Sequence, residues 1–310
     1  MMHSEQDLVS VVIPTYNRAE YLKDTIDSVL KQTYPATEVI IIDDGSEDEC
    51  KKRIRELAAL DPKVSSFRFS GNNGIAAARN EGARRSRGKY VIYMDDDDLL
   101  HPQMIERCIK SFENPLIDVV ICKSDIIQNT HGDKRKMIYK RQRIIQTNKR
   151  LKWINNPGRK LEFFTFYFPR NHSIIYRKEL LLDNPVPVNL TYGCHQDNFL
   201  WLLLCKAGAH FDSVDFIGAF YRVHDQRPTS SVKSLGKSEI FIQEASVIFQ
   251  NSKDQMLLQR FYTTELKTFG AIGFFGYWKR IMNTPFLSLR LGWAHQQNLL
   301  LTWWKLRFGA

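Results

Sequence analysis

Residues Tyr90–Pro102 read YVIYMDDDDLLHP and place four consecutive aspartates directly after an apolar run. Two carboxylates about 4 Å apart repel by roughly 4 kcal/mol at an effective dielectric constant of about 20, so Asp95–Asp98 need a positive partner. The stretch therefore predicts a bound cation, and a solvated acidic loop is the alternative. Because side chains alternate along an extended backbone, we expect the first and third aspartates to face one way and the other two the opposite way.

The apolar run is one of four short segments rich in β-branched or aromatic residues, which predict strands: Leu8–Ile13, Glu38–Ile42, Val64–Phe69 and Tyr90–Met94. Helical patterns such as Tyr21–Gln32 separate them. This alternation predicts a largely parallel sheet with helices on both faces. Ligands of such sheets bind beyond the carboxyl ends of the strands, so we expect PTYN, DDGS and DDDD, which follow the first, second and fourth strands, to meet at one edge.

The alternation weakens after about Leu116. Three further strands and one helix are predicted there from apolar patterning: strands at Val119–Cys122, His172–Arg177 and Asp215–His224, and a helix at Asp197–Ala207. From about Lys237 onward the pattern is helical and aromatic.

Composition limits the class of protein. A hydrophobic content of 43% over 310 residues suffices for a large core and excludes general disorder. The five cysteines are scattered without a CxxC pair, which argues against a disulfide framework or a zinc site and favours the reducing cytoplasm. We expect no secretion signal in the polar lead MMHSEQD and no membrane-spanning helix, because apolar runs of 18 residues are lacking.

The net charge of +10 is unevenly distributed. Lys134–Lys160 contains eleven basic residues and Lys267–Ala310 contains six, and both segments lack acids. Such segments indicate anionic partners. The second also holds four of the six tryptophans, which suits an interfacial surface on anionic lipid, although core helices are an alternative. Nucleic-acid binding is disfavoured because no recognition fold accompanies the basic residues.

Two segments carry a family resemblance: VSVVIPTYNRAEYLKDTIDSVLKQTYPATEVIIIDDGS and NNGIAAARNEGARRSRGKYVIYMDDDDLLHP. Over about 100 residues, their order and spacing resemble the nucleotide-binding half of the family 2 inverting glycosyltransferases. The resemblance implies an α/β GT-A fold with a mostly parallel, Rossmann-like sheet. It also implies a nucleotide-sugar-binding half at 1–115, an acceptor-binding half at 116–236 and a C-terminal helical extension at 237–310.

The resemblance implies roles for particular residues of the first half. The nucleoside is held by Pro14, Tyr16 and Asp44, Arg79 lies near the nucleotide, Asp97 ligates Mn²⁺ or Mg²⁺, and Asp95 and Asp96 lie close to the ribose and the ligand shell. Purely structural roles remain open for several of these positions. The DDGS aspartates could cap a turn, Tyr16 and Asn17 could cap the following helix, and Arg79 could be a solvated charge.

The second half must supply a base, and GCHQDNFLWLLLCKAG resembles the family's acceptor-side segment. That segment usually carries Glu-Asp, whereas this chain has Gln196-Asp197. We assign Asp197 as the base, with a helix N-cap as the alternative. FYRVHDQRPTSS resembles a Tyr-Arg-x-His segment, which implies His224 as a metal ligand, unless it is a structural histidine, and places Arg222 and Arg227 near phosphate. His195 receives no role.

The resulting hypothesis is a metal-dependent, inverting glycosyltransferase that moves a sugar from a nucleotide-diphosphate donor, UDP favoured, to a saccharide or lipid-linked acceptor. Its setting would be cell-surface polysaccharide synthesis at the cytoplasmic face of the membrane. A nucleotidyltransferase is the enzymatic alternative, because it uses the same carboxylates, metal and diphosphate. A non-catalytic nucleotide-sugar-binding scaffold is the other alternative, and Gln196 is the feature that favours it.

Overall fold

The computed structural model describes residues 7–130, 133–140, 171–188 and 196–224. The chain divides into two units, Met1–Val247 and Ile248–Ala310, and all described residues belong to the first. The predicted extension at 237–310 with its tryptophans, together with His195, Arg227 and most of the basic segment 134–160, lies outside the described residues. The domain boundaries therefore stay a prediction.

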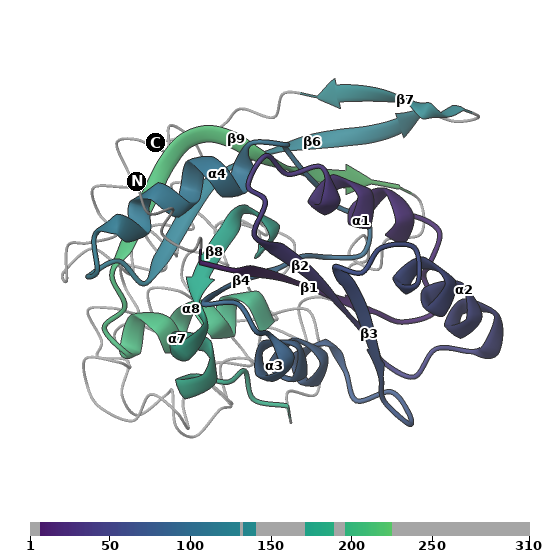
Figure 1. Ribbon diagram of the computed structural model, residues 1–310, viewed down its shortest axis with the longest axis horizontal. Coiled ribbons are helices and arrows are strands. Elements are labelled where there is room, and N and C mark those ends of the chain that lie inside the picture. Colours follow the sequence, from purple (N-terminus) through teal and green to yellow (C-terminus); the bar gives the residue numbers. More distant parts are fainter. Residues whose placement is uncertain (1–6, 131–132, 141–170, 189–195, 225–310) are drawn as a thin grey trace, which may run out of the picture. The chain divides into compact units, whose positions relative to one another are not determined.

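The first half of the sheet is parallel, as predicted. Its strands are β1 (Val9–Thr15), β2 (Thr37–Asp43), β3 (Val64–Arg68) and β4 (Tyr90–Tyr93). They lie in the order β3-β2-β1-β4, with Thr15 opposite Asp43 and Val12 opposite Tyr93 (Figure 1). The carboxyl ends of β1, β2 and β4 consequently share one edge.

The second half of the sheet is mixed. The order continues from β4 through β8 (Ile174–Arg177), β6 (Val119–Thr130) and β9 (Phe211–Val223) to β5 (Leu99–Leu100), while β7 (Asp133–Lys140) forms a hairpin with β6. Among the described strands of this half, β6 and β9 pair in parallel and the other pairs are antiparallel. The sequence predicted the start of β6 and both β8 and β9, but not β5 or β7.

Helices cover both faces of the sheet, as predicted. One face carries α1 (Leu22–Leu30), α2 (Asp48–Ala58) and α4 (Met104–Ile109), and the other carries α3 (Ile75–Arg85), α7 (Lys178–Asp183) and α8 (Gln196–Lys206) (Figure 1). Short 3₁₀ turns occupy Lys110–Glu113 and Asn171–Ser173. Alternate residues of β1 serve the two cores: Val11 packs with the first set of helices and Val12 with the second. Every helix among the described residues is too short or too polar to cross a bilayer.

Helix α3 packs directly on Val12 of β1 at Gly82, which has no side chain. A Cβ at this position would stand 2.1 Å from Cγ1 of Val12, a separation that a packed core cannot accommodate without movement. Gly82 thereby fixes the depth at which α3 sits on the sheet. This matters for the site because the same helix carries Arg79.

Candidate active site

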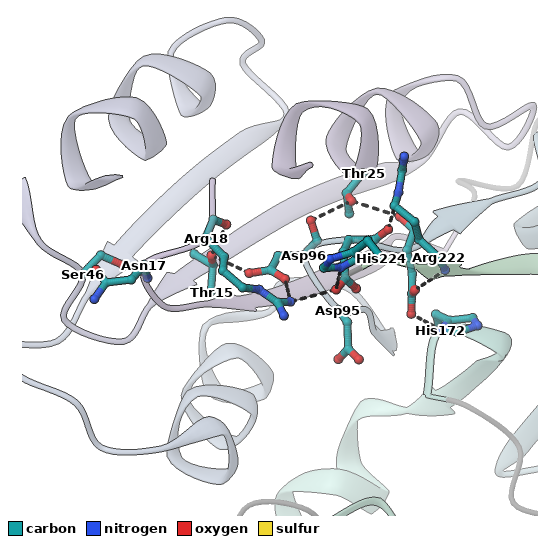
Figure 2. Close-up of polar contacts among 12 residues, drawn as sticks. Thr15, Asn17, Arg18, Thr25, Ser46, Asp95, Asp96, His172, Arg222 and His224 are labelled. Carbon is teal, nitrogen blue, oxygen red and sulfur yellow. Dashed lines mark hydrogen bonds and ion pairs between the residues drawn. The ribbon is translucent and has the colours of Figure 1, made fainter. Parts of the chain in front are cut away.

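The loops after β1 and β2 are joined at the shared edge of the sheet. Asn17 N–H donates to Ser46 Oγ at 2.9 Å, and both residues are drawn in Figure 2. Glu47 N–H donates to Asn17 Oδ1 at 2.7 Å. Asn17 adopts a left-handed backbone with φ 51°, which turns its side chain toward the second loop. The interpretation of Asn17 as a cap of the following helix is wrong, because α1 begins at Leu22 with Tyr21 at its N-cap.

The two aspartates of DDGS have different partners. Asp43 accepts a hydrogen bond from Ser46 N–H at 2.8 Å and pairs with Arg68 at 2.7 Å, so it is the turn-capping residue of this pair. Asp44 accepts the backbone N–H groups of Asn73 and Gly74 at 2.7 and 2.9 Å. Burial raises the pKa of Asp44, and these two hydrogen bonds oppose that effect. Asp44 thus holds the loop that leads into α3.

The remaining expected nucleoside contacts lie at the same edge. Pro14 is buried within β1 beside Ile42 of β2, whereas Tyr16, two residues further on, is 46% exposed. A large aromatic ring in that position is open to a ligand. The nucleoside roles of Pro14, Tyr16 and Asp44 remain predictions.

The four aspartates leave β4 in a turn, and this changes their directions. Asp96 accepts a hydrogen bond from Thr15 Oγ1 at 2.8 Å and pairs with Arg18, whose Nη2 also lies 2.9 Å from Asp97 Oδ2 (Figure 2). The expected alternation of faces is wrong, because one guanidinium contacts two consecutive aspartates. The alternation fails because the extended backbone of β4 ends at Tyr93, before the first aspartate.

The carboxyl of Asp96 is strongly perturbed by its burial. It is 4% exposed, and burial raises its pKa to about 6 although Arg18 favours the charged form. Burial is the largest cause of this rise in pKa, and the neighbouring Asp97 adds to it. Arg79, Arg222, His172 and His224 supply the other nearby basic groups.

Arg222 supports the acidic loop from the neighbouring strand β9. Its Nε donates to the carbonyl of Asp97 at 2.8 Å, and its backbone N–H donates to Asp98 Oδ1 at 3.0 Å. The guanidinium lies 4.7 Å from the ring centre of Tyr21 and 3.2 Å from Asp24 Oδ2. These contacts bury Arg222 and hold the loop in place, a role that the sequence did not indicate.

The acidic loop offers a set of ligands that fits a divalent cation. Carboxylate oxygens of Asp95, Asp97 and Asp98 all lie within 4.8 Å of one another. His224 Nε2 stands 3.0 Å from Asp97 Oδ2, and His172 Nδ1 stands 2.6 Å from Asp98 Oδ2. Hard oxygen ligands of this kind suit Mn²⁺ or Mg²⁺. Asp97 and His224, the two residues expected to bind metal, thus lie together, while Asp96 lies outside this set.

Arg79 joins the two halves of the site. It is buried in α3, and its Nη1 lies 2.5 Å from Asp197 Oδ1 while its Nη2 lies 3.2 Å from Asp95 Oδ1. Burial disfavours the charge of Arg79, but attraction to Asp197 and Asp95 outweighs this and raises its pKa. The alternative of a solvated Arg79 is wrong. Arg79 therefore bridges Asp197, the expected base from the acceptor half, and Asp95 in the acidic loop.

Asp197 lies in the first turn of α8 and is 46% exposed at its side chain. Its carboxylate accepts hydrogen bonds from Arg79 and from Asn171 Nδ2, the latter at 2.6 Å. Among the described residues, no backbone N–H of α8 donates to it, so these contacts give no support to the helix-cap alternative. Its role as a base remains a prediction.

Sequence reasoning missed three residues of the site: Arg18, Asn171 and His172. Arg18 directly follows the PTYN motif, so its position at the sheet edge could have drawn attention to it. Asn171 and His172 precede the short strand β8, where only the apolar pattern was informative. Their importance comes from partners in other elements, Asp197 and Asp98 respectively.

Comparison with solved structures identifies the class of fold. TarS residues 1–349 from S. aureus in complex with UDP-GlcNAc superimposes with a TM-score of 0.62 at 18% identity, covering 96% of this chain and 81% of that one. Mannosyltransferase PcManGT from Pyrobaculum calidifontis, in complex with GDP-Man and Mn²⁺, gives a TM-score of 0.58 at 16% identity, covering 99% and 88%. The mixed sheet with an acidic loop at its edge is the GT-A fold, as predicted.

Sequence comparison then identifies the family. The family described as glycosyl transferase family 2 matches residues 10–181, and the chain belongs to it. The putative teichuronic acid biosynthesis glycosyltransferase TuaG of Bacillus subtilis is 36% identical over 106 residues, which are 34% of this chain and 42% of that protein. Chondroitin synthase of Escherichia coli is 39% identical over 109 residues, 35% of this chain and 16% of that protein. The chain thus spans less than half the length of either relative.

Proposed function

We propose that this protein transfers a sugar, with inversion, from a nucleotide-diphosphate donor to an acceptor hydroxyl. The observation that carries this proposal is the buried Arg79, which contacts Asp95 in the acidic loop and Asp197 in the acceptor half. A carboxylate suited to act as a base therefore stands beside a carboxylate cluster suited to a metal and a diphosphate. The same arrangement disfavours a purely scaffolding protein.

On the donor side, Asp97, Asp95 and Asp98 would hold the divalent cation, with His224 beside them. When bound, the cation stabilises the negative charge that develops on the departing diphosphate. Tyr16, Pro14 and Asp44 line the edge of the sheet where the nucleoside binds. Arg222 keeps the acidic loop in position during this binding.

On the acceptor side, Asp197 removes the proton of the incoming hydroxyl. Its Oδ1 is held by Arg79 and Asn171, whereas Oδ2 makes no hydrogen bond among the described residues and is available to the acceptor. The deprotonated oxygen attacks the anomeric carbon from the side opposite the diphosphate. A single displacement of this kind inverts the anomeric configuration.

The test is a charge-removing, shape-conserving substitution, Asp197→Asn. Release of nucleotide from UDP-, GDP- and dTDP-sugars with Mn²⁺ first identifies the donor that the wild type uses. General-base catalysis commonly contributes about 10² to 10⁴ in rate, so turnover of Asp197→Asn should fall by that factor while donor affinity by calorimetry stays nearly unchanged. Asp183→Asn, an exposed aspartate at the end of α7, is the matched control. Transfer by Asp197→Asn at the wild-type rate would exclude Asp197 as the base.

The donor, acceptor and location complete the proposal. UDP is favoured because TarS was solved with UDP and with UDP-GlcNAc. Polysaccharide synthesis is favoured by the names of TuaG and chondroitin synthase. A saccharide or lipid-linked acceptor at the cell surface is the expectation carried over from the family resemblance. A cytoplasmic protein bound peripherally to anionic membrane would use the basic, tryptophan-rich tail. Flotation with anionic vesicles tests this, and binding should weaken when the tail's basic residues are neutralised: Lys279, Arg280, Lys305 and Arg307.

A further inference from the structure

The candidate base Asp197 is held through one of its two oxygens. Arg79 Nη1 and Asn171 Nδ2 both donate to Oδ1, at 2.5 and 2.6 Å. They approach from different elements, since Arg79 belongs to α3 and Asn171 to the 3₁₀ turn before β8. Two donors on one oxygen fix the rotation of the carboxylate, and this determines where the second oxygen points.

Asn171 is itself held in one orientation. It is 4% exposed, and its Oδ1 accepts a hydrogen bond from the Tyr176 hydroxyl at 3.2 Å. Burial raises the pKa of Tyr176 well above its usual value, so the hydroxyl keeps its proton and is a donor. A donating hydroxyl requires the amide oxygen on its side, and the amide NH₂ must then face Asp197.

Tyr176 is in turn fixed by packing. It is fully buried in β8, and its ring centre lies 5.8 Å from that of Tyr93 and 6.2 Å from that of Trp201. Trp201 belongs to α8, the helix that carries Asp197. The hydrogen-bonded chain from Tyr176 through Asn171 to Asp197 therefore begins in the rigid core and ends at the candidate base.

We propose that Asn171 is a positioning residue for this base: its amide, oriented by Tyr176, holds Asp197 Oδ1 so that Oδ2 faces the acceptor hydroxyl. The inference rests on the proposed function, because it assigns a purpose to Asn171 only if Asp197 acts as the base. Arg79 alone, shared between Asp197 and Asp95, leaves the carboxylate free to swing about a single contact. Asn171 supplies the second contact that stops this movement.

The experiment compares Asn171→Ala, the isosteric Asn171→Asp and Tyr176→Phe with the wild type. The readout is the rate of nucleotide release from the sugar donor selected by the screen above, together with donor affinity. A misplacement of about 1 Å in a reacting group can cost about 10²-fold, so turnover of Asn171→Ala should fall by about 10- to 100-fold with unchanged donor affinity. Asn171→Asp should be slower still, because it replaces a hydrogen-bond donor by a second carboxylate. Tyr176→Phe should lose less than Asn171→Ala.

A matched control separates positioning from stability. Asn80 is also buried and bonds through both amide atoms, to the backbone of Val186 at 2.7 and 3.0 Å. Asn80→Ala should lower the melting temperature about as much as Asn171→Ala but retain turnover per folded molecule. If Asn171→Ala turns over like Asn80→Ala, the inference is overturned while the proposed function stands. If Asp197→Asn retains the wild-type rate, the proposed function falls and takes this inference with it.

Discussion

Arg18 contacts two consecutive aspartates of the acidic loop, and its removal gives the most discriminating prediction. Its Nη2 contacts Asp96 and lies 2.9 Å from Asp97 Oδ2, the oxygen that His224 also approaches. A divalent cation bound to that oxygen would repel the guanidinium, so metal binding has to displace Arg18. Arg18→Gln should therefore destabilise the metal-free protein and strengthen its binding of Mn²⁺.

The magnitude follows from the burial of the partners. The Arg18 side chain is 30% exposed, whereas those of Asp96 and Asp97 are 5% and 2% exposed. Loss of one partner from a buried ion pair costs about 3–5 kcal/mol, and from an exposed pair about 0–1 kcal/mol. Partial exposure of Arg18 places the cost near 2 kcal/mol, which corresponds to a fall in melting temperature of about 3 °C for a chain of this size. If Mn²⁺ no longer has to break this contact, its affinity should rise about 30-fold.

Two measurements check this. Thermal unfolding in EDTA gives the stability of the metal-free protein, and calorimetric titration gives the affinity for Mn²⁺. The control is Arg87→Gln, which removes an exposed arginine paired with Glu38 and should leave Mn²⁺ affinity unaltered. Weaker binding of Mn²⁺ by Arg18→Gln, or an unchanged melting temperature in EDTA, would refute the displacement argument.

Three further predictions address the loop and the core. The pKa of Asp96 is about 6 in the folded protein and about 3.9 in the unfolded chain. The protonated carboxyl therefore stabilises the fold fully below about pH 4, and this stabilisation is lost as pH rises through 6. Asp96→Asn should thus be more stable than the wild type at pH 7.5 in EDTA, and urea unfolding should show the difference closing toward pH 4.5. Arg222→Met should lower the free energy of unfolding by about 3 kcal/mol and weaken Mn²⁺ binding, because the loop loses its support; unchanged Mn²⁺ affinity would contradict this. Gly82→Ala should cost about 1–3 kcal/mol in thermal unfolding through its clash with Val12.

Local patterning was sufficient to predict most of the fold. The strands β1 to β4 and the helix α1 were predicted from apolar periodicity, which depends on neighbours in sequence. The strand β5 has only two residues, and Leu99 pairs with Phe220, far along the chain. Such a strand exists because of its distant partner, so periodicity could not reveal it. The strand β7 was also missed, because its basic residues lack the apolar alternation that predicts a strand.

In the candidate site, too, residues in sequence motifs were predicted and residues defined by a distant partner were missed. Asp44, Asp97 and Asp197 could be proposed as site residues because they stand at strand or helix ends in segments that resemble the family's motifs, and their roles remain predictions. Asn171 was missed because a lone asparagine carries no chemical signal until Asp197 is placed beside it. The alternation expected of the four aspartates failed for a related reason: strand geometry was extended past Tyr93, where the backbone already turns.

The support that Arg222 gives to Asp98 has a consequence for synthesis of the protein. The two residues are 124 positions apart in the chain. At about 5–20 residues per second, a ribosome needs about 6–25 s to make that interval. A nascent chain that has just reached the four aspartates already contains Arg18 and Arg79, whereas His172, Arg222 and His224 are still to be synthesised. The first four strands can pair early, whereas the acidic loop gains the support of Arg222 only when β9 is made. A ribosome that stalls before Arg222 therefore leaves the parallel half of the sheet with an unsupported acidic loop.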